Sequence, residues 1–284
     1  MYIDKSRLPD FLRHDRPKLA AAAKSLVRGI RDYFSEAGYG KAVIGLSGGI
    51  DSAVSFALGV KALGAKNVIA VRLPFRNNND RSLAVAEEIA TTLGLPDGNL
   101  LTWDITPAVE ASWSALSHHF HPSTAQEEHI RLGNQAARER MKVLMDIATH
   151  VGGLVLGTEN RTEEVMAYFT IGGDSVSNLE PIQGLWKVEV FQLAEYLGLP
   201  QSVLDRAPSA ELWDGQTDET DLGAYAVADT VLAALMDLRL SRAAVIGRFG
   251  VSSEDFDRVV AYADRMSGKR HAPGRIPRPS SLVR

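Results

Sequence analysis

Two serines, two glycines and an aspartate stand close together in the segment SGGIDS, residues 47–52, between two apolar runs. The apolar residues before the segment predict a buried strand over 41–46, and those after it predict a helix over 50–63. The first amides of a helix are unpaired and its dipole is positive there, so a glycine-rich loop at this point can bind a phosphate. A plain turn from strand to helix, with Asp51 near the helix cap, is the alternative.

The acid in this loop indicates a cation as well as an anion. The segment lacks the lysine of GxxxxGK[ST] and the spacing of GxGxxG, so it is neither of those nucleotide loops. Ser47, Gly48 and Gly49 allow the backbone to close around a phosphate, and Ser52 adds a hydroxyl donor. A carboxylate repels phosphates unless a cation lies between them, and we therefore interpret Asp51 as a Mg²⁺ ligand.

Composition restricts the class of protein. The chain has 284 residues, of which 45% are hydrophobic and 23% charged, and this is typical of a globular protein. A formal net charge of -4 gives no basic field for nucleic acid or an anionic membrane. The absence of cysteine excludes disulfides and a cysteine nucleophile. No apolar run reaches the roughly 20 residues that span a bilayer, and no signal peptide is apparent, so we expect a cytoplasmic protein.

Short strands alternate with longer helices along the chain, which predicts an α/β fold with a parallel sheet and helices on both faces. We expect one domain over 1–284, because no linker rich in Gly, Pro or Ser divides it. The expected strands are 41–46, 67–73, 100–105 and 153–156. The expected helices are 17–37, 50–63, 80–93, one from about 107, 126–149, 162–168, 187–197, 223–240 and 254–266. A polar loop is expected from the end of the 187–197 helix to 220, and the basic, proline-rich tail 267–284 should be irregular.

Four histidines crowd the region between two predicted helices. These are His118, His119, His121 and His129. A metal site is one interpretation, but no carboxylates stand at matching spacings. We interpret the group as a solvated connection.

The SGGxDS pattern resembles the signature of the ATP pyrophosphatases, a family of adenylating enzymes that includes NAD synthetases, GMP synthetases and asparagine synthetase domains. Further segments resemble the ammonia-dependent NAD synthetases over about 41–223. These segments are VRLPFR (71–76), GNQAARERM (133–141), GTENRTEEVMAYFT (157–170), GGD (172–174), LWKVEVFQLAEYLGLP (185–200) and APSAELWDGQTDETDLG (207–223). The resemblance implies a Rossmann-like adenine nucleotide alpha hydrolase fold, with ATP and Mg²⁺ as cofactors.

The resemblance also implies an ATP-binding set. Its members are Gly45, Leu46, Ser47, Gly48, Gly49, Ile50, Asp51, Ser52, Arg72, Thr158, Lys187 and Ser209. Lys187 would contact the phosphates and support the charge on departing pyrophosphate, so it is a catalytic candidate with Asp51. Glu163 would be the second Mg²⁺ carboxylate, with Glu164 as its rival. Two alternatives stay open, because Glu163 could be an ordinary first-turn acid and Lys187 a solvated lysine at a helix start.

The acid-substrate half departs from the family pattern. The implied substrate contacts are Arg138, Ile171, Asp174, Asn178 and Lys269. Arg140 lies on another helix face from Arg138, so the two should not enter one site. Relatives typically read FTKYGDGxxD where this chain reads FTIGGDSVSN, so a lysine is replaced by Ile171, a glycine by Ser175 and an aspartate by Asn178. Where relatives have a histidine followed by a lysine near the C-terminus, this chain has Gly268 and Lys269. Our hypothesis is that these changes reshape the site that binds the acid substrate.

The expected reaction is ATP-dependent adenylation of a carboxylate, release of pyrophosphate, and attack by ammonia to form an amide. Deamido-NAD is the leading substrate. Ammonia would arrive free or from a separate glutaminase, because no glutaminase domain is recognised. The resemblance implies a homodimer, with helix 126–149 as a plausible part of its surface. Two other functions stay open: an amide ligase or adenylating enzyme for a different carboxylic acid in a specialised pathway, and a non-catalytic nucleotide-binding protein. The partner of residues 1–16 also stays open.

Overall fold

Four parallel strands form a sheet in the part of the chain that the structure describes, in the order β3–β2–β1–β4. They are β1 Ala42–Gly45, β2 Val68–Arg72, β3 Leu100–Thr102 and β4 Leu154–Val155. Strand β1 is central, because its Ala42 pairs with Val68 of β2 on one side and with Leu154 of β4 on the other. The computed structural model describes residues 2–76, 80–208 and 223–271. The predicted parallel α/β fold is confirmed.

The helices follow the predicted pattern with a few corrections. They are α1 Arg16–Glu36, α2 Ile50–Leu63, α3 Asp80–Thr92, α4 Thr106–His119, α5 Ala125–Val151, α6 Arg161–Met166, α7 Lys187–Leu197, α8 Gln201–Leu204, α10 Tyr225–Met236, α11 Arg242–Phe249 and α12 Ser253–Arg265. The loop prediction after α7 was wrong at α8, and α11 was not predicted. The tail prediction was wrong for Ser267–His271, which form a 3-10 helix. Strand β3 also ends three residues early, since Asp104 Oδ1 accepts the Thr106 N–H at 2.8 Å where α4 begins.

Side chains of β1 alternate between two hydrophobic clusters, as the two-residue period of a strand requires. Ala42 and Ile44 join a large cluster with residues of α1, α2, α3 and α7. Val43 points to the opposite face and packs in a second cluster with residues of α4 and α5. The sheet is therefore covered by helices on both faces.

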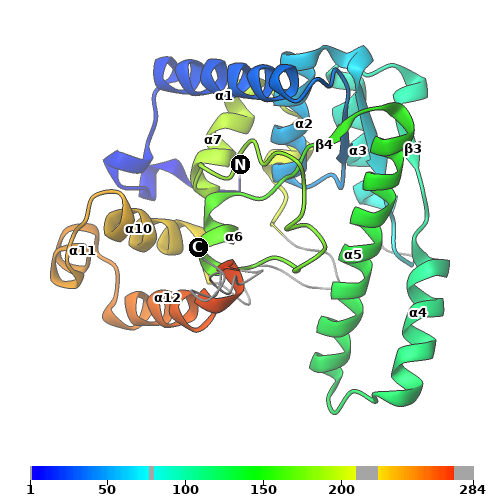
Figure 1. Cartoon of the computed structure of the whole chain (residues 1–284). Coiled ribbons are helices and arrows are strands. Elements are labelled where there is room, and N and C mark those ends of the chain that lie inside the picture. Colours follow the sequence, from blue (N-terminus) through cyan, green and yellow to red (C-terminus); the bar gives the residue numbers. More distant parts are fainter. Residues whose placement is uncertain (1, 77–79, 209–222, 272–284) are drawn as a thin grey trace, which may run out of the picture.

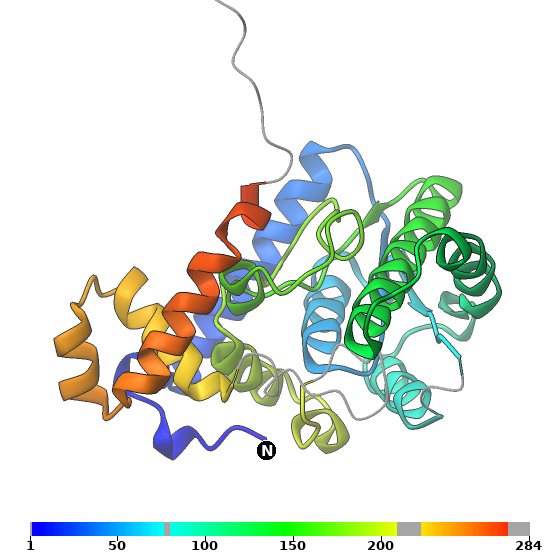
Figure 2. The same ribbon diagram turned by 90° about the horizontal axis from the view of Figure 1, so that it is seen from below.

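The outer helices lie at opposite sides of this sheet (Figures 1 and 2). Helices α4 and α5 form a long antiparallel pair that projects beyond the sheet, and α5 contacts β1 and β4. Helices α10, α11 and α12 pack together on the other side, where α10 contacts both α6 and α7. Within the described ranges, no helix combines the length and the apolar character needed to cross a bilayer.

Candidate active site

A cavity of about 300 Å³ opens at the carboxyl ends of β1, β2 and β4. Parallel α/β sheets bind ligands at this edge, because the loops that leave the strands converge there. Most of the predicted ATP-binding residues line the cavity. These are Gly45, Leu46, Ser47, Gly49, Ile50, Asp51, Ser52, Arg72, Thr158 and Lys187. Ser209 lies outside the described residues.

The glycine loop is folded by its own serines. Ser52 Oγ donates to Gly49 O at 2.9 Å and lies 3.1 Å from Ser47 Oγ, which accepts the Gly49 N–H at 3.2 Å. Gly48 has φ +81°, and a Cβ there would stand 2.7 Å from Ser82 O, so only glycine fits without strain. Helix α2 begins at Ile50 without a side-chain cap, which leaves its first-turn amides for an anion.

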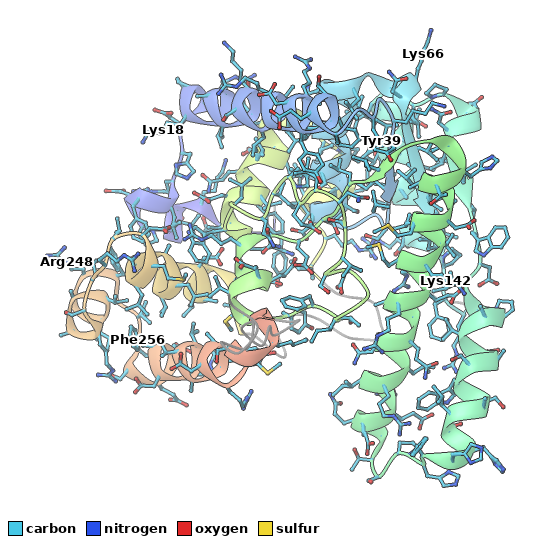
Figure 3. The ribbon with its side chains drawn as sticks, in the orientation of Figure 1. Lys18, Tyr39, Lys66, Lys142, Arg248 and Phe256 are labelled. Atoms are coloured by element: carbon cyan, nitrogen blue, oxygen red, sulfur yellow. The ribbon has the colours of Figure 1, made fainter. Side chains whose placement is uncertain are left out.

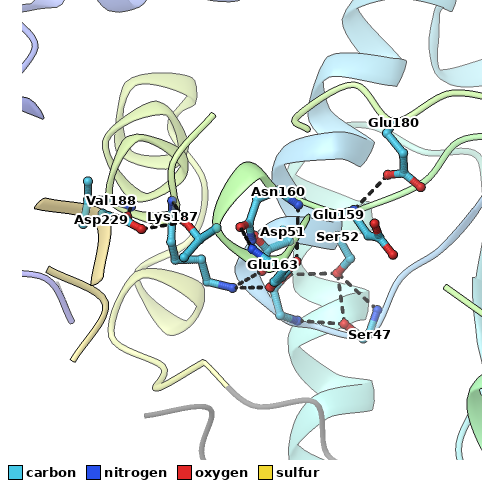
Figure 4. A network of polar contacts seen from close by, with 12 residues as sticks. Ser47, Asp51, Ser52, Glu159, Asn160, Glu163, Glu180, Lys187, Val188 and Asp229 are labelled. Carbon is cyan, nitrogen blue, oxygen red and sulfur yellow. Dashed lines mark hydrogen bonds and ion pairs between the residues drawn. The ribbon is translucent and has the colours of Figure 1, made fainter. Parts of the chain in front are cut away.

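Lys187 joins two carboxylates at the wall of this cavity. Its Nζ donates to Asp51 Oδ2 at 2.6 Å and to Glu163 Oε1 at 3.0 Å (Figure 4). Only 1% of the Lys187 side chain is exposed. The alternative of a solvated lysine at a helix start was therefore wrong, since burial of an ammonium group requires paired anions.

Asn160 connects the two carboxylates to the start of α6. Its side chain accepts the Glu163 N–H at 3.0 Å, while a Glu163 oxygen accepts the Asn160 N–H at 3.3 Å, which forms a capping box. Asn160 Nδ2 also donates to Asp51 Oδ1 at 2.8 Å. Glu163 is thus both a first-turn acid of α6 and a partner of Lys187.

A buried polar network fixes the start of α7, where Lys187 stands. Thr162 Oγ1 accepts the Lys187 N–H at 2.9 Å and donates to Asp229 Oδ1 at 2.6 Å. Asp229 Oδ2 accepts the Val188 N–H at 2.8 Å (Figure 4). Burial raises the pKa of Asp229 to about 7, against these hydrogen bonds. The network connects the Lys187 N–H to α6 through Thr162 and the neighbouring Val188 N–H to α10 through Asp229.

Asp51 and Glu163 fit a Mg²⁺ ion by the chemistry of their oxygens. Both carboxylates lie within 3.0 Å of the same nitrogen, so they face one point. Mg²⁺ prefers oxygen ligands and is usually held by one or two carboxylates together with substrate phosphates and waters. Over the described part of the chain, no cluster of three or more His, Asp or Glu side chains offers a complete metal cage. A pair of carboxylates beside a phosphate loop is therefore the donor set that this site offers.

A second group of acidic residues, of which only Asp174 was predicted from the sequence, lies at the wall of this cavity and next to it. Glu159 and Asp174 both line the cavity, and Glu180 Oε2 accepts the Glu159 N–H at 2.8 Å. Glu159 is 6% exposed, and its Oε1 has no hydrogen-bond partner among the described residues. Burial, with the nearby charges of Asp174 and Glu180, raises the pKa of Glu159 to about 9. Burial also raises the pKa of Glu180 to about 7 and raises the pKa of Asp174.

Gly157 allows this acidic group to form. A Cβ at Gly157 would lie 2.0 Å from Glu180 Oε1, so any side chain would displace the Glu180 carboxylate. The sequence offered a weak signal for Glu159, because it follows Thr158 directly after a strand. Glu180 had no such signal, since it reaches the site through a bridge between Leu156 and Leu179.

Among the described residues, three arginines line the cavity. Arg72 Nε donates to Thr102 Oγ1 at 2.9 Å, and its Nη1 lies 3.3 Å from Glu87 Oε2. Arg140 Nε donates to Leu73 O at 3.2 Å, and burial lowers its pKa in spite of Asp174. Arg206 Nη2 donates to Ser82 Oγ at 2.5 Å and its Nη1 to Gly48 O at 3.4 Å, so it connects the glycine loop to α3. Neither Arg140 nor Arg206 was predicted from the sequence to be a site residue; Arg140 lines the cavity and Arg138 does not, so the two do not share it.

Of the five predicted acid-substrate residues, only Asp174 lines the cavity among the described residues. Asp174 lines the cavity, where its Oδ1 accepts the Thr170 N–H at 2.6 Å. Arg138 Nε donates to the carbonyl of Ile171 at 3.1 Å, and Ile171 itself is 45% exposed. Lys269 Nζ donates to the carbonyl oxygens of residues 167 and 169, the first at 3.0 Å, and burial lowers its pKa. Asn178 Oδ1 accepts the N–H of residue 155 in β4 at 2.8 Å.

The cavity that contains the glycine loop is not lined by Arg138, Ile171, Asn178 or Lys269. They form or hold the segment 167–178, which adjoins the cavity at Tyr168, Thr170 and Asp174. The four histidines are exposed, in α4, in α5 and in the turn between them. Glu164, the rival of Glu163, is also not among the lining residues.

Comparison with known proteins gives a consistent result. Residues 22–273 match the NAD synthase family. The chain is 39% identical over 249 residues to the NH3-dependent NAD+ synthetase of Chlorobaculum tepidum, covering 87% of this chain and 86% of that protein. The structure is similar to that of the NMN synthetase of Francisella tularensis, with TM-score 0.77, 31% identity and coverage of 94% of this chain and 100% of the other. It is also similar to the NH3-dependent NAD synthetase of Campylobacter jejuni, with TM-score 0.72, 25% identity and coverage of 93% and 100%.

Proposed function

The chain belongs to the NAD synthase family, and on that basis we propose that it is an ATP-dependent ligase that converts deamido-NAD to NAD. The nicotinate carboxylate would attack the α-phosphorus of ATP, which forms an acyl-adenylate and releases pyrophosphate. Ammonia would then attack the acyl carbon, so that a C–N bond forms, AMP leaves and one proton is lost. The observation that carries this proposal is the cluster of Lys187, Asp51 and Glu163 beside an uncapped glycine loop.

The glycine loop would bind the phosphates through backbone amides at the start of α2. Asp51 and Glu163 would hold Mg²⁺, which when bound neutralises phosphate charge. Lys187 would stabilise the charge that develops on pyrophosphate as the bond to the α-phosphorus breaks. Its buried position supports this role, because a charge in a site that excludes water interacts more strongly than one in solvent.

The acid substrate would lie along the segment 167–178, next to Asp174. Arg138 and Lys269 are positively charged side chains that donate to carbonyl oxygens of this segment. At neutral pH the raised pKa keeps Glu159 protonated, so this part of the cavity wall carries less negative charge toward an anionic substrate. We propose that the acid is positioned by Asp174, Glu159, Arg138 and Lys269. The last two would be its cationic contacts.

Amidation of the smaller nicotinate mononucleotide is a second candidate reaction. It is supported by the similarity to the NMN synthetase of Francisella tularensis. The replacement of a lysine by Ile171 and of an aspartate by Asn178 also supports it, since Asn178 uses its side-chain oxygen to hold β4. A site with fewer charged side chains favours nicotinate mononucleotide, which is smaller than deamido-NAD and offers fewer groups for them to contact.

A homodimer is the assembly that we propose. Three large apolar side chains, Leu116, Phe120 and Ile130, are 42%, 65% and 47% exposed on or next to α4 and α5. Exposed apolar groups of this kind favour burial against a second surface. Light scattering after gel filtration should give twice the chain mass, and a mass equal to that of one chain would contradict the dimer.

One assay tests the proposed reaction and its acceptor. The protein is incubated with ATP, Mg²⁺ and ammonium, together with deamido-NAD or nicotinate mononucleotide, and the products are measured by mass spectrometry. We expect NAD and AMP in equal amounts, with a higher kcat/KM for deamido-NAD. A higher kcat/KM for the mononucleotide would select the second candidate. No amide from either acid would refute both.

A further inference from the structure

The point between Asp51 and Glu163 is already held by a cation of the chain itself. Lys187 Nζ lies 2.6 Å from one carboxylate and 3.0 Å from the other, and the ring of Tyr225 lies 4.9 Å from the same nitrogen. These are the two carboxylates that the proposed function assigns to Mg²⁺. Asp51 and Glu163 would hold a divalent ion with the oxygens that now accept from the Lys187 ammonium group, so the two cations would compete for the pair.

The lysine cannot simply withdraw into solvent from this position. Its backbone is fixed by Thr162, and 99% of its side chain is buried. Burying an ammonium group without an anion costs several kcal/mol. Lys187 therefore leaves the carboxylates readily only if another anion lies close by. The glycine loop is that place, since Asp51 is part of its segment and a phosphate on the loop would lie near the same nitrogen.

We propose that Lys187 acts as an internal counter-ion that keeps Mg²⁺ from the carboxylate pair until the phosphates of ATP arrive. The phosphates would then accept Lys187, and the freed carboxylates would accept the metal ion. This inference rests on the proposed function for its metal site. Binding of nucleotide and metal is consequently coupled, and the coupling is reciprocal: each raises the affinity for the other.

Binding of Mn²⁺ in the absence of nucleotide tests this role directly, with the electron paramagnetic resonance signal of free Mn²⁺ as the readout. Lys187→Met removes the charge and retains a chain of similar length. We expect this variant to bind Mn²⁺ at least tenfold more tightly than the unaltered protein. The double variant Lys187→Met with Asp51→Asn should lose that gain, which places the ion at the pair.

Lys142→Met is the matched control. Lys142 also forms a 2.6 Å ion pair with a carboxylate, that of Glu139, but it lies on α5 with its side chain 67% exposed (Figure 3). Its removal should leave Mn²⁺ affinity within about twofold of the unaltered protein. Lys187→Arg retains the positive charge and should also keep Mn²⁺ binding weak.

Equal or weaker Mn²⁺ binding by Lys187→Met would overturn the proposal. A second measurement needs no variant: the unaltered protein should bind Mn²⁺ without nucleotide only at millimolar concentrations, and saturation in the micromolar range would also overturn it. Neither result depends on NAD formation. Failure of the counter-ion role and failure of the proposed function are therefore distinguished by the two assays.

Discussion

Replacement of Glu159 by glutamine should change how stability depends on pH. Burial raises the pKa of Glu159 from the ordinary 4.5 to about 9, so between pH 5 and pH 8 the folded protein holds a proton that the unfolded chain has released. The free energy of unfolding then falls as pH rises, by about 1.4 kcal/mol per pH unit for this group. Below pH 4.5 both states are protonated and the effect vanishes.

Glutamine has nearly the same shape as protonated glutamate and does not titrate, so Glu159→Gln should remove this slope. Relative to the unaltered protein, the variant should gain about 3 kcal/mol of stability between pH 6 and pH 8, which is two pH units of that slope. Urea unfolding followed by circular dichroism at pH 6, 7 and 8 measures the difference.

Glu36→Gln, an exposed acid at the end of α1, controls for the loss of one carboxyl group. Glu180 and Asp229 titrate in the same range, but they are present in both proteins and cancel in the comparison to first order. Parallel pH profiles for Glu159→Gln and the unaltered protein would refute the assignment of a buried, protonated Glu159.

Three other variants test the glycine loop, the α7 anchor and the acceptor segment. Gly48→Ala should weaken binding of an ATP analogue at least tenfold in calorimetry, because its Cβ would meet Ser82 O at 2.7 Å; unchanged affinity would contradict the loop assignment. Thr162→Val should lower the free energy of unfolding by about 1–3 kcal/mol, since Asp229 loses a buried donor. The control Thr149→Val removes only a surface hydroxyl contact, so an equal loss there would contradict the argument. Ile171→Lys should lower the KM for deamido-NAD several-fold and leave the KM for ATP unchanged, and an unchanged KM for deamido-NAD would exclude this position from the acid site.

The regular elements could be predicted where local signals were strong. Helices α2 and α7 have the predicted ends, because each is apolar and buried over most of its length and each is followed by a glycine with positive φ, Gly64 and Gly198. Helix α11 was missed although Ser241 caps its start and Gly250 its end. Its eight residues gave too short a pattern to separate from the neighbouring helices.

The glycine loop could be predicted to be an anion site from residue types alone, because all of its residues are adjacent in sequence, and that role stays a prediction. The resemblance brought Asp51, Glu163 and Lys187 into one site, but the direct ion pairs were not foreseen. Lys187 and Asp51 stand 136 positions apart, and their contact depends on how α2 and α7 pack. No pattern along the chain reports such a distance.

The contact between Glu159 and Glu180 could not be predicted from the sequence, for the same reason. Glu180 meets Glu159 only because the chain after β4 folds back and Leu179 bridges Leu156. A raised pKa depends on burial, and burial is a property of the packed site. Local patterns indicate which residues could do chemistry, whereas their protonation and pairing come from contacts between distant segments.

Transfer of oxygen from the acid to AMP tests the central claim most directly. Deamido-NAD with both nicotinate carboxylate oxygens labelled with ¹⁸O is converted in the presence of ATP, Mg²⁺ and ammonium, and the AMP is examined by mass spectrometry. If the carboxylate is adenylated, each AMP carries one ¹⁸O and each NAD retains the other. Unlabelled AMP, or ADP in its place, would contradict the proposed adenylation.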